Sequence, residues 1–254
     1  MTKWDANLYL QFADERARPA ADLIAHIALK TPRRIMDLGC GPGNSTEQLH
    51  TRWPQAEITG LDSSAEMLAK ACKNHPDWRW VQADIGGWKA ESAFDLVFAN
   101  ASLHWATDHE TLFPHLLRQV APGGALAAQM PAQSDSPAHQ MMKDVAKEFA
   151  GQLRGFRYPL WIGEPGFYYD VLAPHAAQVE VWQTVYHHPL DGPEKVVEWI
   201  RGSGMLPYLE ALPDEATRKQ FELRCLERFT EAFPCRTDGK VLLPYPRVFV
   251  VAYT

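Results

Sequence analysis

The stretch Asp37-Leu38-Gly39-Cys40-Gly41-Pro42-Gly43 decides the fold. It closes an apolar run that begins near residue 34, and an amphipathic pattern from Thr46 to Trp53 follows it, so a strand, a glycine loop and a helix are expected in turn. Glycine lets backbone approach a ligand where a Cβ atom would collide. The spacing G-x-G-x-G behind an acid differs from the G-x-G-x-x-G of dinucleotide-binding dehydrogenases, and an acid here suits a cationic amino-acid tail better than a diphosphate.

Strand-like and helix-like patterns alternate along the chain, which predicts an α/β fold with a mostly parallel sheet flanked by helices. Capping patterns, Asn44 with Glu47 and Ser63 with Glu66, open the first two helices. The expected strands are near 34–39, 57–62, 78–84, 94–101, 124–130, 179–186 and 247–253, and the expected helices include 46–53, 65–73, 193–202 and 214–232.

The chain is expected to form one domain, residues 1–254, with a helical cap inserted before the last strand. Its core spans about 30–131 together with strands near 179–190 and 247–254. An N-terminal arm, 1–29, and cap segments, about 132–178 and 191–246, complete it.

Composition and charge exclude several classes of function. The formal net charge of −6 argues against binding to nucleic acid or to an anionic membrane, because both need clustered Lys and Arg. The N-terminus lacks the apolar stretch of a signal peptide, so a cytoplasmic location is expected. No metal is expected, since neither CxxC nor zinc spacing occurs, and the cysteines are predicted to be reduced thiols: Cys40, Cys72, Cys225 and Cys235.

Polar residues end four successive predicted strands, at Asp37, Asp62, Asp84 and Asn100. Ligands of doubly wound sheets bind at the carboxyl edge of the strands, and an acid about 20 residues beyond the glycine loop is placed to meet ribose hydroxyls. Two simpler interpretations stay open: the loop as an ordinary tight turn, and Asp62 as a helix N-cap.

These motifs resemble the class I S-adenosylmethionine-dependent methyltransferases, through Gly39 to Gly43, Gly60-Leu61-Asp62, Ala83-Asp84-Ile85, Phe94 to Asn100 and Pro122-Gly123-Gly124. The resemblance implies a Rossmann-like seven-stranded sheet with an antiparallel last strand. It also implies S-adenosylmethionine as the cofactor, with S-adenosylhomocysteine as its product. The cofactor-binding residues then expected are Tyr9, Arg16, Asp37, Gly39, Gly41, Gly43, Asn44, Asp62, Ser63, Met67, Ala83, Asp84, Ile85, Asn100, Ala101 and His104.

Further stretches resemble the trans-aconitate 2-methyltransferase family across nearly the whole chain. They include Tyr9 to Phe12, Phe98 to Trp105, Gln129-Met130-Pro131, Trp199 to Leu209 and Tyr245 to Ala252. The resemblance implies a small polycarboxylic acid, most specifically trans-aconitate, as the substrate and a methyl ester as the product. Residues 132–135 depart from the family pattern, in which a bulkier, more acidic loop is expected.

This chemistry needs no general base, because a carboxylate with a reference pKa of about 4 is already ionised at neutral pH. The other carboxylates of the acid need cations, for which Arg16, Arg18, Arg201 and Arg247 are candidates. Each also has a simpler interpretation, as a solvated helix residue, a cation at a helix C-terminus or a surface charge at a strand end. The expected substrate-binding residues are Arg18, Trp105, Gln129, Trp199, Arg201, Tyr208 and Arg247, although aromatic residues in a helical cap are more often core.

Competing functions are separated by other features of the sequence. Amino-methylation of a nucleic acid needs a D/N-P-P-Y run where this chain has Asn100-Ala101-Ser102-Leu103. Methylation of another small acid or of a carrier-bound acyl group would share the core and differ in the cap. A non-catalytic cofactor-binding module is the third alternative, and the oligomeric state is left open.

Overall fold

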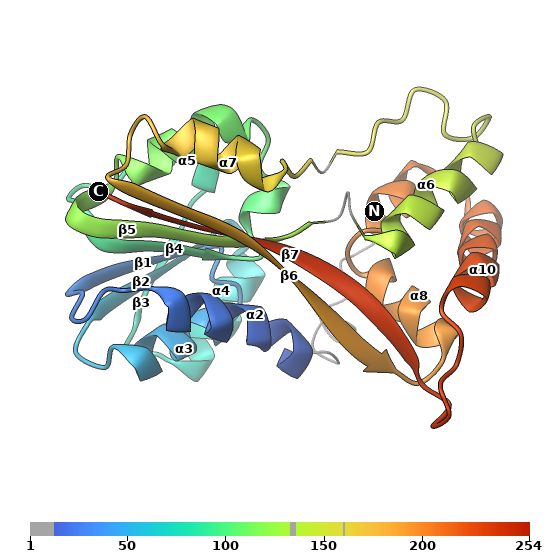
Figure 1. Cartoon of the computed structure of the whole chain (residues 1–254), viewed down its shortest axis with the longest axis horizontal. Coiled ribbons are helices and arrows are strands. Elements are labelled where there is room, and N and C mark those ends of the chain that lie inside the picture. The colour runs from blue at the N-terminus through green and yellow to red at the C-terminus, as the bar shows by residue number, and fades with distance from the viewer. Residues whose placement is uncertain (1–12, 133–135, 160) are drawn as a thin grey trace. The chain divides into compact units, whose positions relative to one another are not determined.

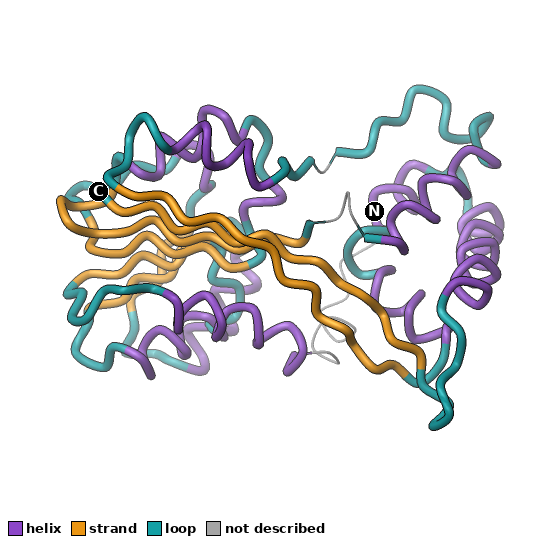
Figure 2. The backbone as a smooth tube through the Cα atoms, in the orientation of Figure 1, coloured by secondary structure: helices purple, strands orange, loops and turns teal. Residues whose placement is uncertain are grey.

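The computed structural model describes residues 13–132, 136–159 and 161–254, with backbone alone for 13–16. The chain divides into two compact units. Of the described residues, the sheet unit comprises 16–131, 162–184 and 247–254, and the helical unit comprises 13–15, 132, 136–159, 161 and 185–246. Figures 1 and 2 show the chain as ribbon and tube.

The sheet has seven strands in the order β3-β2-β1-β4-β5-β7-β6. The first five pair in parallel, and β7 runs antiparallel to β5. The predicted seven-stranded, mostly parallel sheet with an antiparallel last strand is therefore confirmed. The strands are β1 (Arg34–Leu38), β2 (Glu57–Asp62), β3 (Arg79–Gln82), β4 (Phe94–Asn100), β5 (Val120–Pro131), β6 (Gln178–Leu190) and β7 (Val241–Tyr253).

Helices cover both faces of the sheet, which is why the central strands read as almost continuous apolar runs. Helices α2, α3 and α4 lie on one face, and α5 and α7 lie on the other (Figure 1). Their amphipathic patterns explain this, as in α5, where Leu112, Phe113, Leu116 and Leu117 are buried. The helices of this unit are α2 (Ala13–His26), α3 (Asn44–Arg52), α4 (Ala65–Asn74), α5 (His109–Leu117) and α7 (Pro165–Leu172), with short 3-10 turns η1 (Ile85–Gly87) and η2 (Leu103–Trp105).

Both predicted capping residues were wrong by one position. Gly43, in a left-handed conformation, precedes the first residue of α3, so Asn44 lies inside the helix. Ser64, rather than Ser63, caps α4, and its hydroxyl accepts from the amide of Met67 at 3.3 Å. The carboxylate of Asp62 accepts a hydrogen bond from the amide of Ser64, and this turn places the N-cap at Ser64, one residue later than expected.

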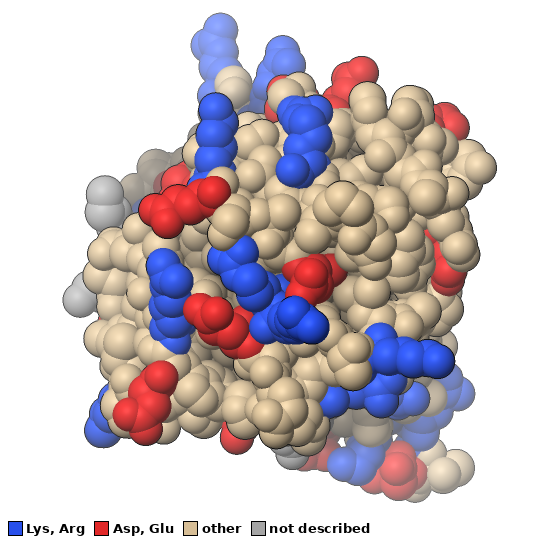
Figure 3. All heavy atoms as spheres, turned by 90° about the vertical axis from the view of Figure 1, so that its left-hand side faces the viewer, with Lys and Arg blue, Asp and Glu red and all other residues tan. Residues whose placement is uncertain are grey.

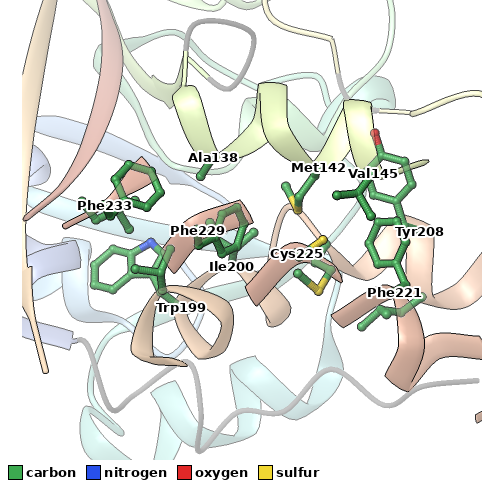
Figure 4. Close-up of a cluster of buried hydrophobic side chains, with 14 of the residues drawn as sticks. Ala138, Met142, Val145, Trp199, Ile200, Tyr208, Phe221, Cys225, Phe229 and Phe233 are labelled. Atoms are coloured by element: carbon green, nitrogen blue, oxygen red, sulfur yellow. The ribbon is translucent and has the colours of Figure 1, made fainter. Parts of the chain in front are cut away.

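The helical unit has a hydrophobic core of its own. Helix α8 buries Val196, Trp199 and Ile200, and α10 buries Phe221 and Phe229, at spacings that place each set on one helix face. Figure 4 shows side chains from several of these helices converging in that core. The helices of this unit are α6 (Pro137–Glu148), α8 (Pro193–Arg201), α9 (Leu206–Ala211) and α10 (Glu215–Ala232).

The units differ in their boundaries from the expected arm, core and cap. Residues 16–29, expected in the arm, belong to the sheet unit, and residues 185–190, expected in the core, belong to the helical unit. Residues 162–178 were expected in the cap, but they belong to the sheet unit, where α7 packs against α5. His109 and Tyr168 join the two helices through a buried hydrogen bond of 2.9 Å between Nδ1 and the phenol oxygen. The polar pair satisfies both side chains where the two helices meet.

The surface and the thiols have few unusual features. Figure 3 shows one face of the molecule, on which Lys and Arg side chains are interspersed with Asp and Glu. All four cysteines are free. Within the described ranges, no helix is long and apolar enough to cross a membrane, and no cluster of potential metal ligands occurs.

Candidate active site

The glycine loop after β1 has a backbone that side chains would strain. Gly39, Gly41 and Gly43 have φ values of 69°, 56° and 99°. A Cβ atom on Gly39 would lie 2.2 Å from the Cβ atom of Ser102, whereas one on Gly41 would meet nothing within 4 Å. Gly39 is therefore required by its neighbour, and Gly41 presents bare backbone to open space.

Asp37, the residue before the last one of β1, is a fully buried acid. Its Oδ2 accepts hydrogen bonds from Ser45 (2.8 Å) and Thr46 (2.7 Å), both on the first turn of α3. No other described residue bonds its Oδ1. Burial raises the pKa of Asp37 to about 6, although the hydrogen bonds from the two hydroxyls partly offset this by lowering it. The acid thus keeps one acceptor oxygen for a cationic group.

Asp62, at the end of β2, holds the glycine loop in place. Its Oδ2 accepts from the amide of Gly41 at 2.9 Å, and its Oδ1 accepts from the amide of Ser64 at 2.8 Å. The alternative that Asp62 caps α4 is wrong, because Ser64 is the cap. A carboxylate has about four lone-pair sites, so Asp62 can still accept from two hydroxyls.

Further predicted cofactor-binding residues follow β2 and β3. Ala83 donates its amide to the carbonyl of Asp62 at 3.1 Å. Asp84 caps η1 by accepting from the amide of Gly86, so this exposed acid also has a structural role. The side chain of Ile85 reaches the glycine loop, with its Cδ1 3.5 Å from where a Cβ atom of Gly39 would lie. The exposed Ser63 and the half-buried Met67 lie on the neighbouring turn.

Three adjacent strands supply a row of polar side chains, Asn100, Gln129 and Arg247. Asn100 on β4 is the register partner of Gln129 on β5, and Pro131 is the partner of Arg247 on β7. Nη1 of Arg247 donates to Oε1 of Gln129 at 3.0 Å, and Nε2 of Gln129 donates to Oδ1 of Asn100 at 2.7 Å. Arg247 is only 4% exposed, so the alternative that it is a surface charge is wrong.

The turn after β4 brings His104 to this row. Ala101 has a φ of 51°, and its amide donates to the carbonyl of Gln129 at 2.9 Å. Ser102 donates its hydroxyl to the carbonyl of Leu38 at 2.6 Å. His104 is buried, and burial lowers its pKa to about 3, with smaller contributions from the charges of Arg247 and His109. It is therefore a neutral imidazole at physiological pH.

The remaining predicted substrate-binding residues lie in different surroundings. Arg18 is exposed on α2 and lies 3.9 Å from Asp22, and Trp105 is 51% exposed. In the helical unit, Nε of Arg201 lies 2.7 Å from Oε1 of Glu222. Trp199 and Tyr208 are buried in the core of that unit (Figure 4), which agrees with the alternative that aromatic residues in a helical cap are core residues. Tyr9 and the side chain of Arg16 lie outside the described residues, as do residues 133–135.

Known proteins are similar to this chain in sequence over their full length. A family model described as a methyltransferase domain matches residues 35–124. A trans-aconitate 2-methyltransferase of Azoarcus sp. (strain BH72) is 47% identical over 253 residues, which is 99% of each chain. One of Yersinia pestis (strain Pestoides F) is 46% identical over 261 residues, covering 100% of this chain and 99% of the relative. The chain belongs to the trans-aconitate 2-methyltransferase family.

Solved structures agree on the fold. The YcgJ protein of Bacillus subtilis superposes with a TM-score of 0.61 at 15% identity, over 93% of this chain and 98% of that one. At that identity the likeness concerns the fold alone. Family membership makes the chain an S-adenosylmethionine-dependent methyltransferase. The site fits this cofactor, because bare glycine backbone at Gly41, a buried acid with an oxygen to spare and Asp62 lie at one edge of the sheet.

Some residues of this family member's site were missed in the sequence. Ser45 and Thr46 orient Asp37, and a pair of hydroxyls eight and nine residues after a strand-end acid, on the first turn of a helix, is the signal that could have found them. Ser102 packs against Gly39, and Trp80 packs against Gly43 and Gly60. No local pattern predicts these three contacts, since each joins segments at least 20 residues apart in the chain.

Proposed function

We propose that this chain transfers the methyl group of S-adenosylmethionine to a carboxylate of trans-aconitate, forming a methyl ester. The observation that carries the proposal is Arg247, a buried guanidinium beside Asn100 and Gln129 at the carboxyl edge of the sheet. A planar guanidinium binds carboxylates through two parallel hydrogen bonds. The names of the full-length relatives support the choice of acid.

The chain's residues bind and orient, and they move no proton. The bound cofactor supplies a methyl group on a sulfonium centre, which an ionised carboxylate can attack without prior deprotonation. An O–CH3 bond forms as the S–CH3 bond breaks, and the cofactor leaves as a neutral thioether. Alignment of two bound reactants at near-attack distance can supply about 7–11 kcal/mol. The glycine loop and Asp37 hold the cofactor, and Arg247 holds the acid.

His104 is excluded as a general base by its environment. Its pKa of about 3 makes it a far weaker base than an ordinary histidine, and the accepting carboxylate has no proton to give. The neutral ring adds no charge beside Arg247. The positive charge of this part of the site then comes from the guanidinium.

A panel of acids tests the proposal. The protein is incubated with S-adenosylmethionine and with mono-, di- and tricarboxylic acids in turn, and mass spectrometry detects the gain of one methyl group. We expect kcat/KM to be highest for trans-aconitate and to fall as carboxylates are removed, because fewer carboxylates then remain to interact with the guanidinium of Arg247. Methylation that ignores the number of carboxylates would refute the assignment of the acid.

A further inference from the structure

Gln129 lies at the centre of the row that joins the two strands beside it. Its side chain is 1% exposed and bonds both neighbours, Arg247 on β7 and Asn100 on β4. Its main-chain carbonyl accepts from Ala101, the residue that turns the chain after β4. One residue thus connects the strand ends that carry the proposed acid site and the proposed cofactor site.

The polarity of the Gln129 amide is fixed by its partners. A guanidinium has only donors, so the atom of Gln129 that faces Arg247 must be the carbonyl oxygen. The NH2 group must then face Asn100, and the carbonyl oxygen of Asn100 accepts from it at 2.7 Å. A buried amide with a partner at each end is therefore held in one orientation, with its carbonyl oxygen against the guanidinium of Arg247.

A neutral acceptor suits this position for an electrostatic reason. A carboxylate in place of the amide would orient the guanidinium equally well, but it would also cancel the charge that attracts an anion. The amide orients Arg247 and leaves its charge intact. This matters in a chain whose net charge is −6, because binding of a polyanion depends on a local cation.

From this geometry we infer that Gln129 is a positioning residue that sets the guanidinium of Arg247 for the acid and does not itself bind the acid. The inference rests on the proposed function, since it concerns the same carboxylate site. It differs from the sequence-based expectation, in which Gln129 contacts the substrate. On this inference, the site binds anions because the buried side chain of Gln129 is neutral and leaves the charge of Arg247 uncancelled.

Two substitutions of similar shape separate positioning from packing. Gln129→Met keeps the length of the side chain and removes both hydrogen bonds, and Gln129→Glu keeps the shape but places an anion against Arg247. We expect Met to raise KM for trans-aconitate about tenfold to a hundredfold, the usual range for a hydrogen bond to a charged group, with kcat within about threefold. We expect Glu to raise KM further, although it is the closer match in shape. A residue that only fills space would give the opposite order.

Binding measurements make the outcome independent of turnover. Calorimetry with S-adenosylhomocysteine present gives the affinity for trans-aconitate, and calorimetry with S-adenosylhomocysteine alone should show an unchanged affinity in both variants. Gln119→Glu is the matched control, because Gln119 also bonds at both ends, to Ala90 and His115, elsewhere in the sheet unit. This control is expected to keep the parental KM.

The outcomes distinguish the inference from the proposed function. If the parent methylates trans-aconitate and Gln129→Glu binds it as tightly as the parent does, the inference is wrong and the function stands. If the parent binds the acid without methylating it, and Glu weakens binding more than Met, the function is wrong and the positioning role stands. A parent that does not bind the acid refutes both.

Discussion

His104 is held neutral by its surroundings, and the pH dependence of the reaction follows from that. Burial, with smaller contributions from the nearby charges of Arg247 and His109, lowers its pKa to about 3. At saturating cofactor the rate should therefore be flat between pH 8 and pH 6, because neither His104 nor the ionised acid substrate titrates there. Asp37, whose pKa is about 6 in the unliganded site, is kept ionised by the bound cationic group. Initial rates at saturating acid and cofactor check this. A fall that follows a group with a pKa near 6.5 would show that a histidine takes part in proton transfer.

Arg247 should be the most sensitive cation of the site. Replacement by Ala is expected to lower kcat/KM for the acid by about 2–4 kcal/mol, much of it from a desolvated carboxylate left without a partner. Arg247→Lys should restore only part of the lost kcat/KM, because an ammonium group cannot form the two parallel hydrogen bonds of a planar guanidinium. Steady-state kinetics of the two variants measure this, with Arg79→Ala as the control, since Arg79 forms an exposed pair with Glu57. Near-parental kinetics in Arg247→Ala would contradict the acid site.

The sequence could not rank the four candidate arginines, because their local patterns are equally ordinary. Burial separates Arg247 from Arg18 and Arg201, and burial arises from pairing between β5 and β7, more than 100 residues apart in the chain. The acids Asp37 and Asp62 were predictable, because each lies at the end of a strand next to a glycine loop or a helix start. Their hydrogen bonds were not.

At the scale of elements, two glycines of the loop between β1 and α3 are expected to have different roles, Gly39 in stability and Gly41 in cofactor binding. Gly39→Ala would place a Cβ atom 2.2 Å from Ser102, so a large loss of stability is expected. Gly41→Ala meets nothing within 4 Å, and its positive φ costs only about 1–2 kcal/mol, but the new methyl group enters the proposed cofactor site. Thermal melts and calorimetry with S-adenosylhomocysteine should show Gly39→Ala as the less stable variant and Gly41→Ala as folded with weaker binding. Unchanged binding in Gly41→Ala would move the cofactor away from this loop.

The positions of the elements were largely predictable, and their ends were not. The sixth strand was expected over 179–186 from its pattern and near 179–190 in the outline of the core, and β6 ends at Leu190. The last strand was expected over 247–253, whereas β7 begins at Val241. Pro189, Pro244 and Pro246 lie in the extra segments, and proline normally argues against a strand because it lacks an amide donor. The N-cap of helix α3 is likewise Gly43, and no capping pattern in the sequence predicts its left-handed backbone.

At the scale of the whole molecule, the observed sheet unit contains most of the predicted core, but it also takes in residues 16–29 and 162–178 and leaves out 185–190. Helix α7 packs against α5 through Tyr168 and His109, a contact between residues 59 positions apart. The two units have separate hydrophobic interiors, and the single domain with a cap stays a prediction.

A buried histidine should make the stability of the helical unit depend on pH. His139 is 3% exposed, no described residue bonds either ring nitrogen, and burial, with a smaller contribution from Lys143, lowers its pKa to about 3. The unfolded chain, with a pKa near 6.5, takes up a proton first as the pH falls, so unfolding becomes easier below pH 6.5. From pH 7 to pH 5 the parent should lose about 2 kcal/mol more free energy of unfolding than His139→Leu. Urea titrations at the two pH values measure this difference. Equal losses of unfolding free energy in the parent and in His139→Leu would show that the imidazole of His139 is exposed to solvent.

Ester formation is the most direct test of the account. The protein is given S-adenosylmethionine with an isotope-labelled methyl group and trans-aconitate, and the product is isolated and treated with mild alkali. We predict one labelled methyl group per acid, released as labelled methanol, because only an ester of the carboxylate hydrolyses in this way. An alkali-stable label, or no label on any polycarboxylic acid with a folded protein that binds S-adenosylhomocysteine, would contradict the account.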